Sequence, residues 1–188
     1  MADRISRQAL ALTQPLNPDF RRDGCALALD HALAIGKIRL LARDFTALFG
    51  VAPPPPRRQI DHDGATFAWL APGEWLVTGP QAAVAAVLAR ADGDLALAID
   101  ISHGRTAFIL SGAEARTAIA TVSPLDAGDR AFPVGGVART LLGDTSMFIA
   151  RLPDRMDGPQ FRIIVDQTMA GYAARMLSEP DGPRRPVQ

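Results

Sequence analysis

The chain has 188 residues, of which 48% are hydrophobic and 21% are charged, so it can bury the core of one domain or of two small fused halves. Lys and Arg together number 20, as do Asp and Glu, and this balance argues against nucleic acid or an anionic membrane surface as the partner. Its one cysteine, Cys25, excludes an internal disulfide and a cysteine-built metal site, and fits the reducing cytoplasm. The sequence predicts neither a secretory signal peptide nor a membrane-spanning segment.

The N-terminal segment predicts little regular structure of its own. Residues 1–34 contain Pro15 and Pro18, which break helices and strands, and show no evident core. We therefore expect an N-terminal arm that orders against another surface, and a domain that folds without residues 1–30. We expect residues 35–178 to form a single α+β domain and the polar residues 179–188 to form a flexible tail.

The first part of this domain shows strand patterns interrupted by prolines. Residues 37–40 alternate between charged and apolar side chains, which predicts a strand with one face toward solvent. The four prolines at 53–56 predict a stiff, extended loop. Residues 66–79 predict two strands around the Pro72–Gly73 turn, and a helix is expected over 80–91.

Two further strand–helix units follow, with a hairpin between them. In the first unit, Ser111 and Glu114 have the spacing of a capping box at the start of a helix. In the second unit, Asp166 is the expected N-cap of a helix that runs to Leu177. The hairpin turns at Gly143, between two apolar runs. This order predicts an α+β fold with ferredoxin-like split βαβ units and antiparallel sheets.

Asp100, Ser102 and His103 are the residue types of a hydrolytic triad, within the stretch "LAIDISHGRTAFILSGAEA". Residues so close along an extended chain do not converge as nucleophile, base and orienting acid, and no Gly-x-Ser-x-Gly elbow surrounds them. We expect instead that Asp100 and Ser102 end a strand and bond the backbone of the following turn.

Metal and phosphate sites are weakly indicated. His31, His62 and His103 are far apart, with no ligand pair on one helical face, and the "DHDG" around His62 is more simply a solvated turn. Gly135 and Gly136 do not join a strand to a helix, so they predict the lead into the hairpin rather than a phosphate cradle. The residues therefore predict no catalytic, cofactor-binding or metal-binding side chain.

Three other residues leave alternatives open. Cys25 follows two arginines that would lower its pKa, although an apolar-flanked cysteine is more often a small buried side chain. Trp69 and Trp75 flank a turn, where they serve equally well as anchors for a partner or as core.

Four segments resemble the gamma subunit family of heterotetrameric sarcosine oxidase: "WLAPGEWLV", "IDISHGRTAFILSGAEA", "SPLDAGDRAFPVGGVARTLLG" and "FRIIVDQTMAGYAARML". The resemblance covers roughly residues 33–178, with the segments in the same order and spacing. It implies a fold like the folate-binding domain of aminomethyltransferases, the glycine-cleavage T proteins. In T proteins the later hairpin carries an aspartate that handles the folate amine. Here Thr145, Ser146 and Met147 stand at that place, which argues against folate chemistry by this chain.

The resemblance implies a complex that demethylates sarcosine to glycine, with formaldehyde and hydrogen peroxide as products, or with one-carbon transfer to tetrahydrofolate. In that family NAD and folate belong to the alpha subunit, FAD to the beta subunit, FMN lies between them, and delta holds zinc. The gamma subunit is a structural partner of alpha, beta and delta, without a cofactor.

Two alternatives stay open. One is the small subunit of a related N-methylglutamate dehydrogenase, and the other is a stand-alone folate-binding protein of the aminomethyltransferase type. For an assembly role, the expected contact regions are the arm, the "PPPPRR" loop and the hairpin that carries Trp69 and Trp75.

Overall fold

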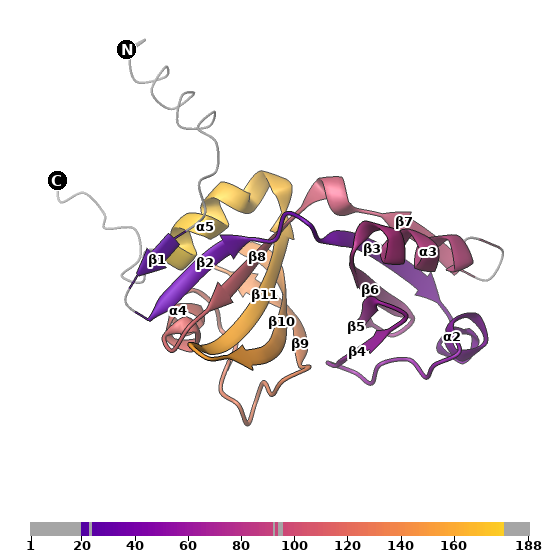
Figure 1. Cartoon of the computed structure of the whole chain (residues 1–188), viewed down its shortest axis with the longest axis horizontal. Helices are drawn as coiled ribbons and strands as arrows, with labels where there is room; N and C mark the ends of the chain where they lie inside the picture. The colour runs from indigo at the N-terminus through magenta and orange to yellow at the C-terminus, as the bar shows by residue number, and fades with distance from the viewer. Residues whose placement is uncertain (1–19, 23, 92, 94–95, 179–188) are drawn as a thin grey trace, which may run out of the picture.

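The computed structural model describes residues 20–22, 24–91, 93 and 96–178. Its strands form two antiparallel sheets, one of six strands and one of five, which lie side by side along the long axis of the molecule (Figure 1). This architecture confirms the predicted α+β class. Residues 1–19 of the expected arm and the expected tail at 179–188 lie outside the described residues.

The six-stranded sheet has the order β1-β2-β8-β11-β10-β9. Its strands are β1 (Phe20–Arg22), β2 (Cys25–Leu29), β8 (Arg105–Ser111), β9 (Val137–Leu142), β10 (Thr145–Arg155) and β11 (Gly158–Asp166). Helices α4 (Ala115–Val122) and α5 (Ala170–Ser178) cover its outer face, where Phe108, Ile119, Phe161 and Ala173 are fully buried (Figure 1). The alternation of apolar side chains along β8 and β11 directs every second residue into this core.

The five-stranded sheet has the order β4-β5-β6-β3-β7. Its strands are β3 (Ala34–Leu40), β4 (Gln59–His62), β5 (Ala65–Ala71), β6 (Glu74–Gly79) and β7 (Ala96–Asp100). Helices α2 (Ala42–Phe49) and α3 (Gln81–Ala91) pack on its outer face. Four aromatic side chains fill this core, with ring centroids 4.8 to 5.3 Å apart: Phe45, Phe49, Phe67 and Trp75.

A third core joins the inner faces of the two sheets. Ile35, Ala68 and Leu76 of the five-stranded sheet meet apolar side chains of the six-stranded sheet, which include Ala107, Phe148 and Ile164. The layers therefore run from helices through two sheets to helices. Both sheets bury one apolar face against helices and part of the other against each other.

Several local predictions are confirmed. The predicted strand at 37–40 lies in β3, and the strands predicted within 66–79 are β5 and β6. The predicted helix over 80–91 is α3, in which Val84 and Val87 are buried. The hairpin at Gly143 joins β9 to β10.

The sequence predicts a boundary at residue 34 between an N-terminal arm and the domain, but the packing of the chain does not follow this boundary. Residues 25–29 form β2, which pairs with β8 inside the six-stranded sheet. Leu27 lies opposite Leu110 and is only 2% exposed. The run "CALAL" thus places apolar side chains in the core beneath α4 and α5, and this part of the expected arm is an integral strand.

The predicted capping box is wrong. Ser111 ends strand β8, paired with Ala26 and Gln160, and does not lie at the N-cap position. Helix α4 begins after Glu114, which makes no side-chain cap hydrogen bond. The second predicted cap is confirmed, because the Asp166 carboxylate accepts a hydrogen bond from the Thr168 N–H at the start of the last helical segment.

Candidate functional site

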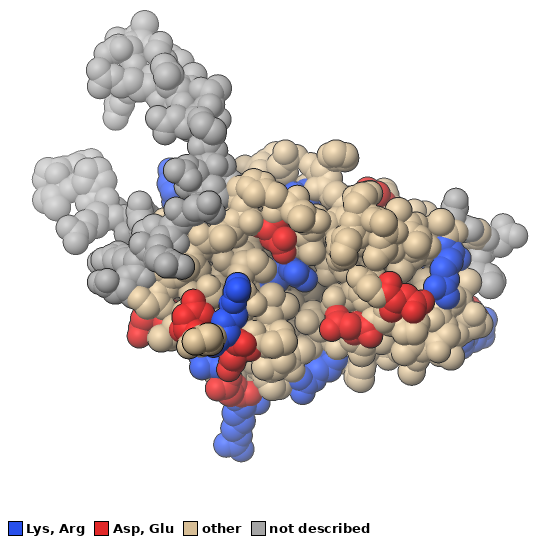
Figure 2. Space-filling view, viewed as in Figure 1, with Lys and Arg blue, Asp and Glu red and all other residues tan. Residues whose placement is uncertain are grey.

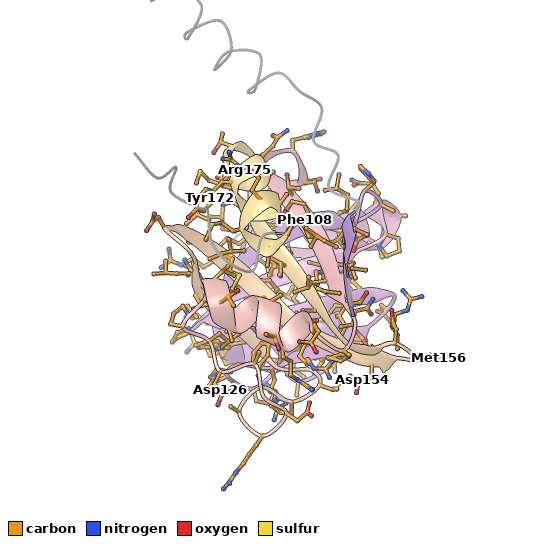
Figure 3. The ribbon with its side chains drawn as sticks, turned by 90° about the vertical axis from the view of Figure 1, so that its left-hand side faces the viewer. Phe108, Asp126, Asp154, Met156, Tyr172 and Arg175 are labelled. Atoms are coloured by element: carbon orange, nitrogen blue, oxygen red, sulfur yellow. The ribbon has the colours of Figure 1, made fainter. Side chains whose placement is uncertain are left out.

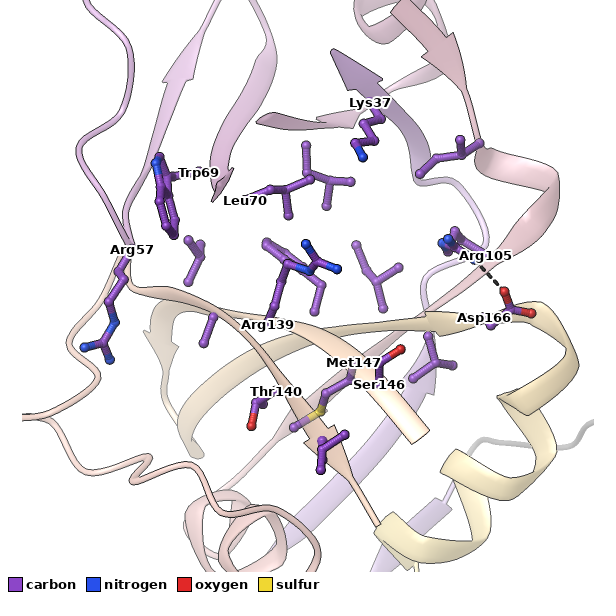
Figure 4. Close-up of a pocket in the computed structure, with 18 residues that line it drawn as sticks. Lys37, Arg57, Trp69, Leu70, Arg105, Arg139, Thr140, Ser146, Met147 and Asp166 are labelled. Carbon is purple, nitrogen blue, oxygen red and sulfur yellow. Dashed lines mark hydrogen bonds and ion pairs between the residues drawn. The ribbon is translucent and has the colours of Figure 1, made fainter. Parts of the chain in front are cut away.

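A groove of about 780 Å3 lies between the two sheets (Figure 4). We call it the inter-sheet groove. Strands β3, β5 and β6 of one sheet and β9, β10 and β11 of the other supply most of its lining. Its apolar lining residues are Leu70, Leu76, Ile101, Val137, Ala138, Leu141, Met147, Phe148, Ile164 and Val165. The third core fills only part of the space between the sheets, and the groove is the part that it leaves open.

The charged lining of the inter-sheet groove is mostly cationic: Lys37, Arg57, Arg105 and Arg139, against the single carboxylate Asp166. Arg105 donates to Asp166 at 2.6 Å. Lys37 Nζ lies 2.9 Å from Glu74, next to the lining. Arg57 and Arg139 form no ion pair with any residue in the described part of the chain. The groove therefore carries net positive charge, with two cations left without a partner there.

Both carboxylates beside the groove are held in their charged form. A hydrogen bond from Lys37 is the first cause that lowers the pKa of Glu74, and the charges of Lys37, Arg39 and Arg139 lower it further. Hydrogen bonds from Thr168 are the first cause that lowers the pKa of Asp166. Because neither carboxylate takes up a proton near neutral pH, the charge of the groove does not change there.

The loop that carries Arg57 is fixed to both sheets. Arg57 has a φ of 63°, a left-handed conformation that non-glycine residues rarely adopt. Its carbonyl accepts a hydrogen bond from the Val137 N–H of β9, and Gln59 N–H donates to the carbonyl of Gly135. These bonds hold the strained residue in place. They also place Gly135 and Gly136 at the lead into β9, as predicted, and add a link between the sheets.

Asp100, Ser102 and His103 do not form a triad. Ser102 Oγ accepts a hydrogen bond from the Ile35 N–H at 2.9 Å and donates to the Ile35 carbonyl at 3.3 Å. The Asp100 carboxylate accepts from the Ser102 N–H at 2.8 Å, which confirms the predicted turn. Hydrogen bonds from Ser102 are also the first cause that lowers the pKa of Asp100. The motif therefore fastens the end of β7 to β3, and its hydroxyl is occupied.

The histidines are separated in the structure. His62 Nε2 lies 2.9 Å from the carbonyl oxygen of Phe49, so this ring nitrogen already has a hydrogen-bond partner. His31 and His103 both line a second hollow of about 710 Å3, beside Ser102. Within the described residues, no group of three His, Cys, Asp or Glu side chains is placed to hold a metal ion.

Burial resolves the alternatives for Cys25 and Trp75. Burial is the first cause that raises the pKa of the Cys25 thiol, and the charge of Glu114 adds to it, so the side chain is no activated thiolate. Trp75 is 2% exposed and belongs to the core. Trp69 is partly exposed and stands at the edge of the inter-sheet groove (Figure 4).

Sequence reasoning missed the cationic groove. Its charged residues come from β3, β8, β9, β11 and the loop after the prolines, and no two of them form a motif. A weak signal was present in β9, where Arg139 and Leu141 alternate with the buried or partly buried residues of "VARTLL". The hairpin that follows contributes Ser146 and Met147 to the groove, and no carboxylate.

A family model described as "Sarcosine oxidase, gamma subunit family" matches residues 48–179. The chain belongs to this family. The match begins near the end of α2 and runs through α5, so it includes every strand of the five-stranded sheet except β3, and every groove-lining residue except Lys37. Membership assigns the chain the gamma-subunit role in sarcosine oxidase. No curated protein matches the chain significantly.

Two solved structures share the fold. The first is a heterotetrameric sarcosine oxidase from Corynebacterium sp. U-96 in complex with pyrrole 2-carboxylate, with a TM-score of 0.71 and 18% identity over 93% of this chain and 91% of that one. The second is glycine cleavage system aminomethyltransferase T from Bartonella henselae, with a TM-score of 0.63 and 16% identity over 83% of this chain and 46% of that one. The fold implied by the sequence resemblance is thereby confirmed.

Proposed function

We propose that this chain is the non-catalytic gamma subunit of a heterotetrameric, flavin-dependent sarcosine oxidase that also contains alpha, beta and delta subunits. The observation that carries the proposal is the family match over residues 48–179. The complex would demethylate sarcosine oxidatively to glycine, with release of formaldehyde or transfer of the one-carbon unit to tetrahydrofolate. The other subunits would hold FAD, FMN, NAD and tetrahydrofolate, and the assembly would work in the cytoplasm.

The side chains of the structure support an assembly role. The hydroxyl of Ser102 is engaged with the backbone of Ile35, and the pKa of Cys25 is raised, so neither is activated for chemistry. Large apolar side chains stand exposed on strands β7 and β9: Leu97, Ile99 and Leu141. Exposed apolar side chains that gather on one surface are typical of contacts between proteins. The described helices include none that is both long and apolar enough to cross a membrane.

Co-expression tests the proposal directly. The chain is tagged and produced together with the alpha, beta and delta subunits encoded in the same genome, and the complex is isolated by affinity capture and size-exclusion chromatography. We expect capture of all three partners in equal amounts, together with sarcosine oxidation by the complex and none by the isolated chain. A chain that remains monomeric in the presence of its partners would refute the proposal.

The inter-sheet groove favours one alternative function, a folate-binding protein of the aminomethyltransferase type. The fold is shared with aminomethyltransferase T, and a groove of about 780 Å3 has room for a small molecule. The β9–β10 hairpin, however, places Thr145, Ser146 and Met147 where the resemblance expects an acidic residue. Titration calorimetry of the isolated chain with tetrahydrofolate separates the two functions, because the assembly role predicts no heat of binding.

A further inference from the structure

An exposed apolar surface continues from the inter-sheet groove along the edge of the five-stranded sheet. In the register of β3 and β7, Ile99 lies opposite Lys37 and Leu97 lies opposite Arg39. Side chains directly opposite each other in an antiparallel pair share one face, so Ile99 and Leu97 lie on the same face as Lys37, which lines the groove. Leu97 is 65% exposed and Ile99 is 52% exposed.

The opposite wall contributes a matching pair of residues. Leu141 on β9 lines the groove and is 49% exposed. Arg139, two residues earlier on the same face, extends its guanidinium group into the middle of the groove, between the walls (Figure 4). Arg139 forms no ion pair with another described residue, although its charge reaches Glu74 across the groove and lowers the pKa of that carboxyl.

We propose that the inter-sheet groove is a docking site for a segment of another subunit that carries an acidic side chain between apolar ones. The acidic side chain pairs with Arg139, and the apolar side chains cover Leu97, Ile99 and Leu141. This assignment rests on the proposed function, because it needs a partner subunit. Charge complementarity decides the occupant: a groove whose charged lining is mostly cationic, and whose Arg139 forms no ion pair with a described residue, is complementary to an acidic segment and repels a basic one.

The shape of the site favours a polypeptide over a small molecule. Small-molecule sites enclose most of the ligand, whereas here the apolar residues at 49% to 65% exposure extend the surface beyond the groove. On the face in Figure 2 both signs of charge are interspersed over the two halves. A cationic groove flanked by exposed apolar side chains is a feature that an interface would bury.

The test uses the co-expressed complex with two groove variants, Arg139→Glu and the double variant Leu97→Ser and Ile99→Ser. The matched controls are Arg43→Glu on α2, where the side chain is 80% exposed, and Met156→Ser, at the tip of the β10–β11 hairpin (Figure 3). We expect each groove variant to reduce capture of the partner by about tenfold or more, because a reversed or removed contact lies at the centre of the interface. Each control variant is expected to remain within about twofold of the original chain.

The outcomes separate this inference from the proposed function. If the original chain captures no partner, the proposed function fails. If it captures partners and the groove variants do so equally well, the docking site is refuted while the proposed function stands. If the melting temperature shows that a groove variant is unfolded, the original chain with a photo-crosslinking amino acid at position 141 is tested instead. A crosslink to an acidic segment of another subunit supports the site, and a crosslink to a second copy of this chain, or none, overturns it.

Discussion

Replacing Leu27 with Ala tests whether the segment before residue 34 belongs to the core. Leu27 is 2% exposed, lies opposite Leu110 and packs among the buried residues beneath α4 and α5. Removing a buried leucine side chain costs about 2–5 kcal/mol, depending on how far the site collapses. Since β1 alone lies between β2 and the sheet edge, we expect partial collapse and a loss of about 3 kcal/mol of unfolding free energy.

Guanidinium denaturation of the isolated chain, followed by far-UV circular dichroism, measures this loss. A loss of that size in a chain of this length corresponds to a melting temperature lower by about 6–12 °C. Leu97→Ala is the matched control, because Leu97 is 65% exposed and its replacement should change the unfolding free energy by less than about 0.5 kcal/mol.

The same reasoning reverses the expectation that the domain folds without residues 1–30. That deletion removes β1 and β2, and it leaves the edge of β8 and the underlying core open to water. We now expect the truncated chain to be unfolded or aggregated. A Leu27→Ala variant that loses less than about 1 kcal/mol, together with a folded truncated chain, would show that residues 25–29 form an arm after all.

Three further predictions concern single side chains. Phe45→Ala should cost about 3–5 kcal/mol in a denaturation experiment, because Phe45 is 0% exposed at the centre of the aromatic cluster. Ser102→Ala should cost about 1–2 kcal/mol in the same kind of experiment, through the lost bonds to Ile35. Iodoacetamide should alkylate Cys25 more slowly in the folded chain than in denaturant at pH 8, read by mass spectrometry, because the pKa of its thiol is raised.

The sequence predicted those elements whose signal is local. The turns at Gly73 and Gly143 have φ values of 74° and 55°, which glycine adopts readily, and both were placed correctly between apolar runs. The cap at Asp166 was also found, because an N-cap acts over two residues. The Ser111–Glu114 spacing misled because pairing with Ala26 and Gln160 extends β8 through Ser111, and spacing alone contains nothing about neighbouring strands.

The elements that were missed had weaker signals, as α2 and β2 illustrate. Helix α2 is eight residues long, and its N-cap, Leu41, makes no side-chain hydrogen bond, so the sequence offers no start signal. Its end was visible in Gly50, with a φ of 73°, and its buried face in Phe45 and Phe49, four residues apart. Strand β2 was missed because it is short, and its partner β8 in the sheet is about 80 residues away in the sequence.

The inter-sheet groove could not be predicted from the sequence for a different reason. Alternation in β3 and β9 shows that Lys37 shares a face with Arg39, and Arg139 with Leu141, but not that these two faces meet. That depends on the third core, where Ile35 and Leu76 of one sheet pack on Phe148 of the other. Catalytic sites often leave short motifs, since chemistry needs a few residues in fixed geometry, whereas a docking groove needs only suitable charge and apolar surface on each wall. Arg139→Glu is the substitution that tests whether the surface assembled from the two sheets has a partner.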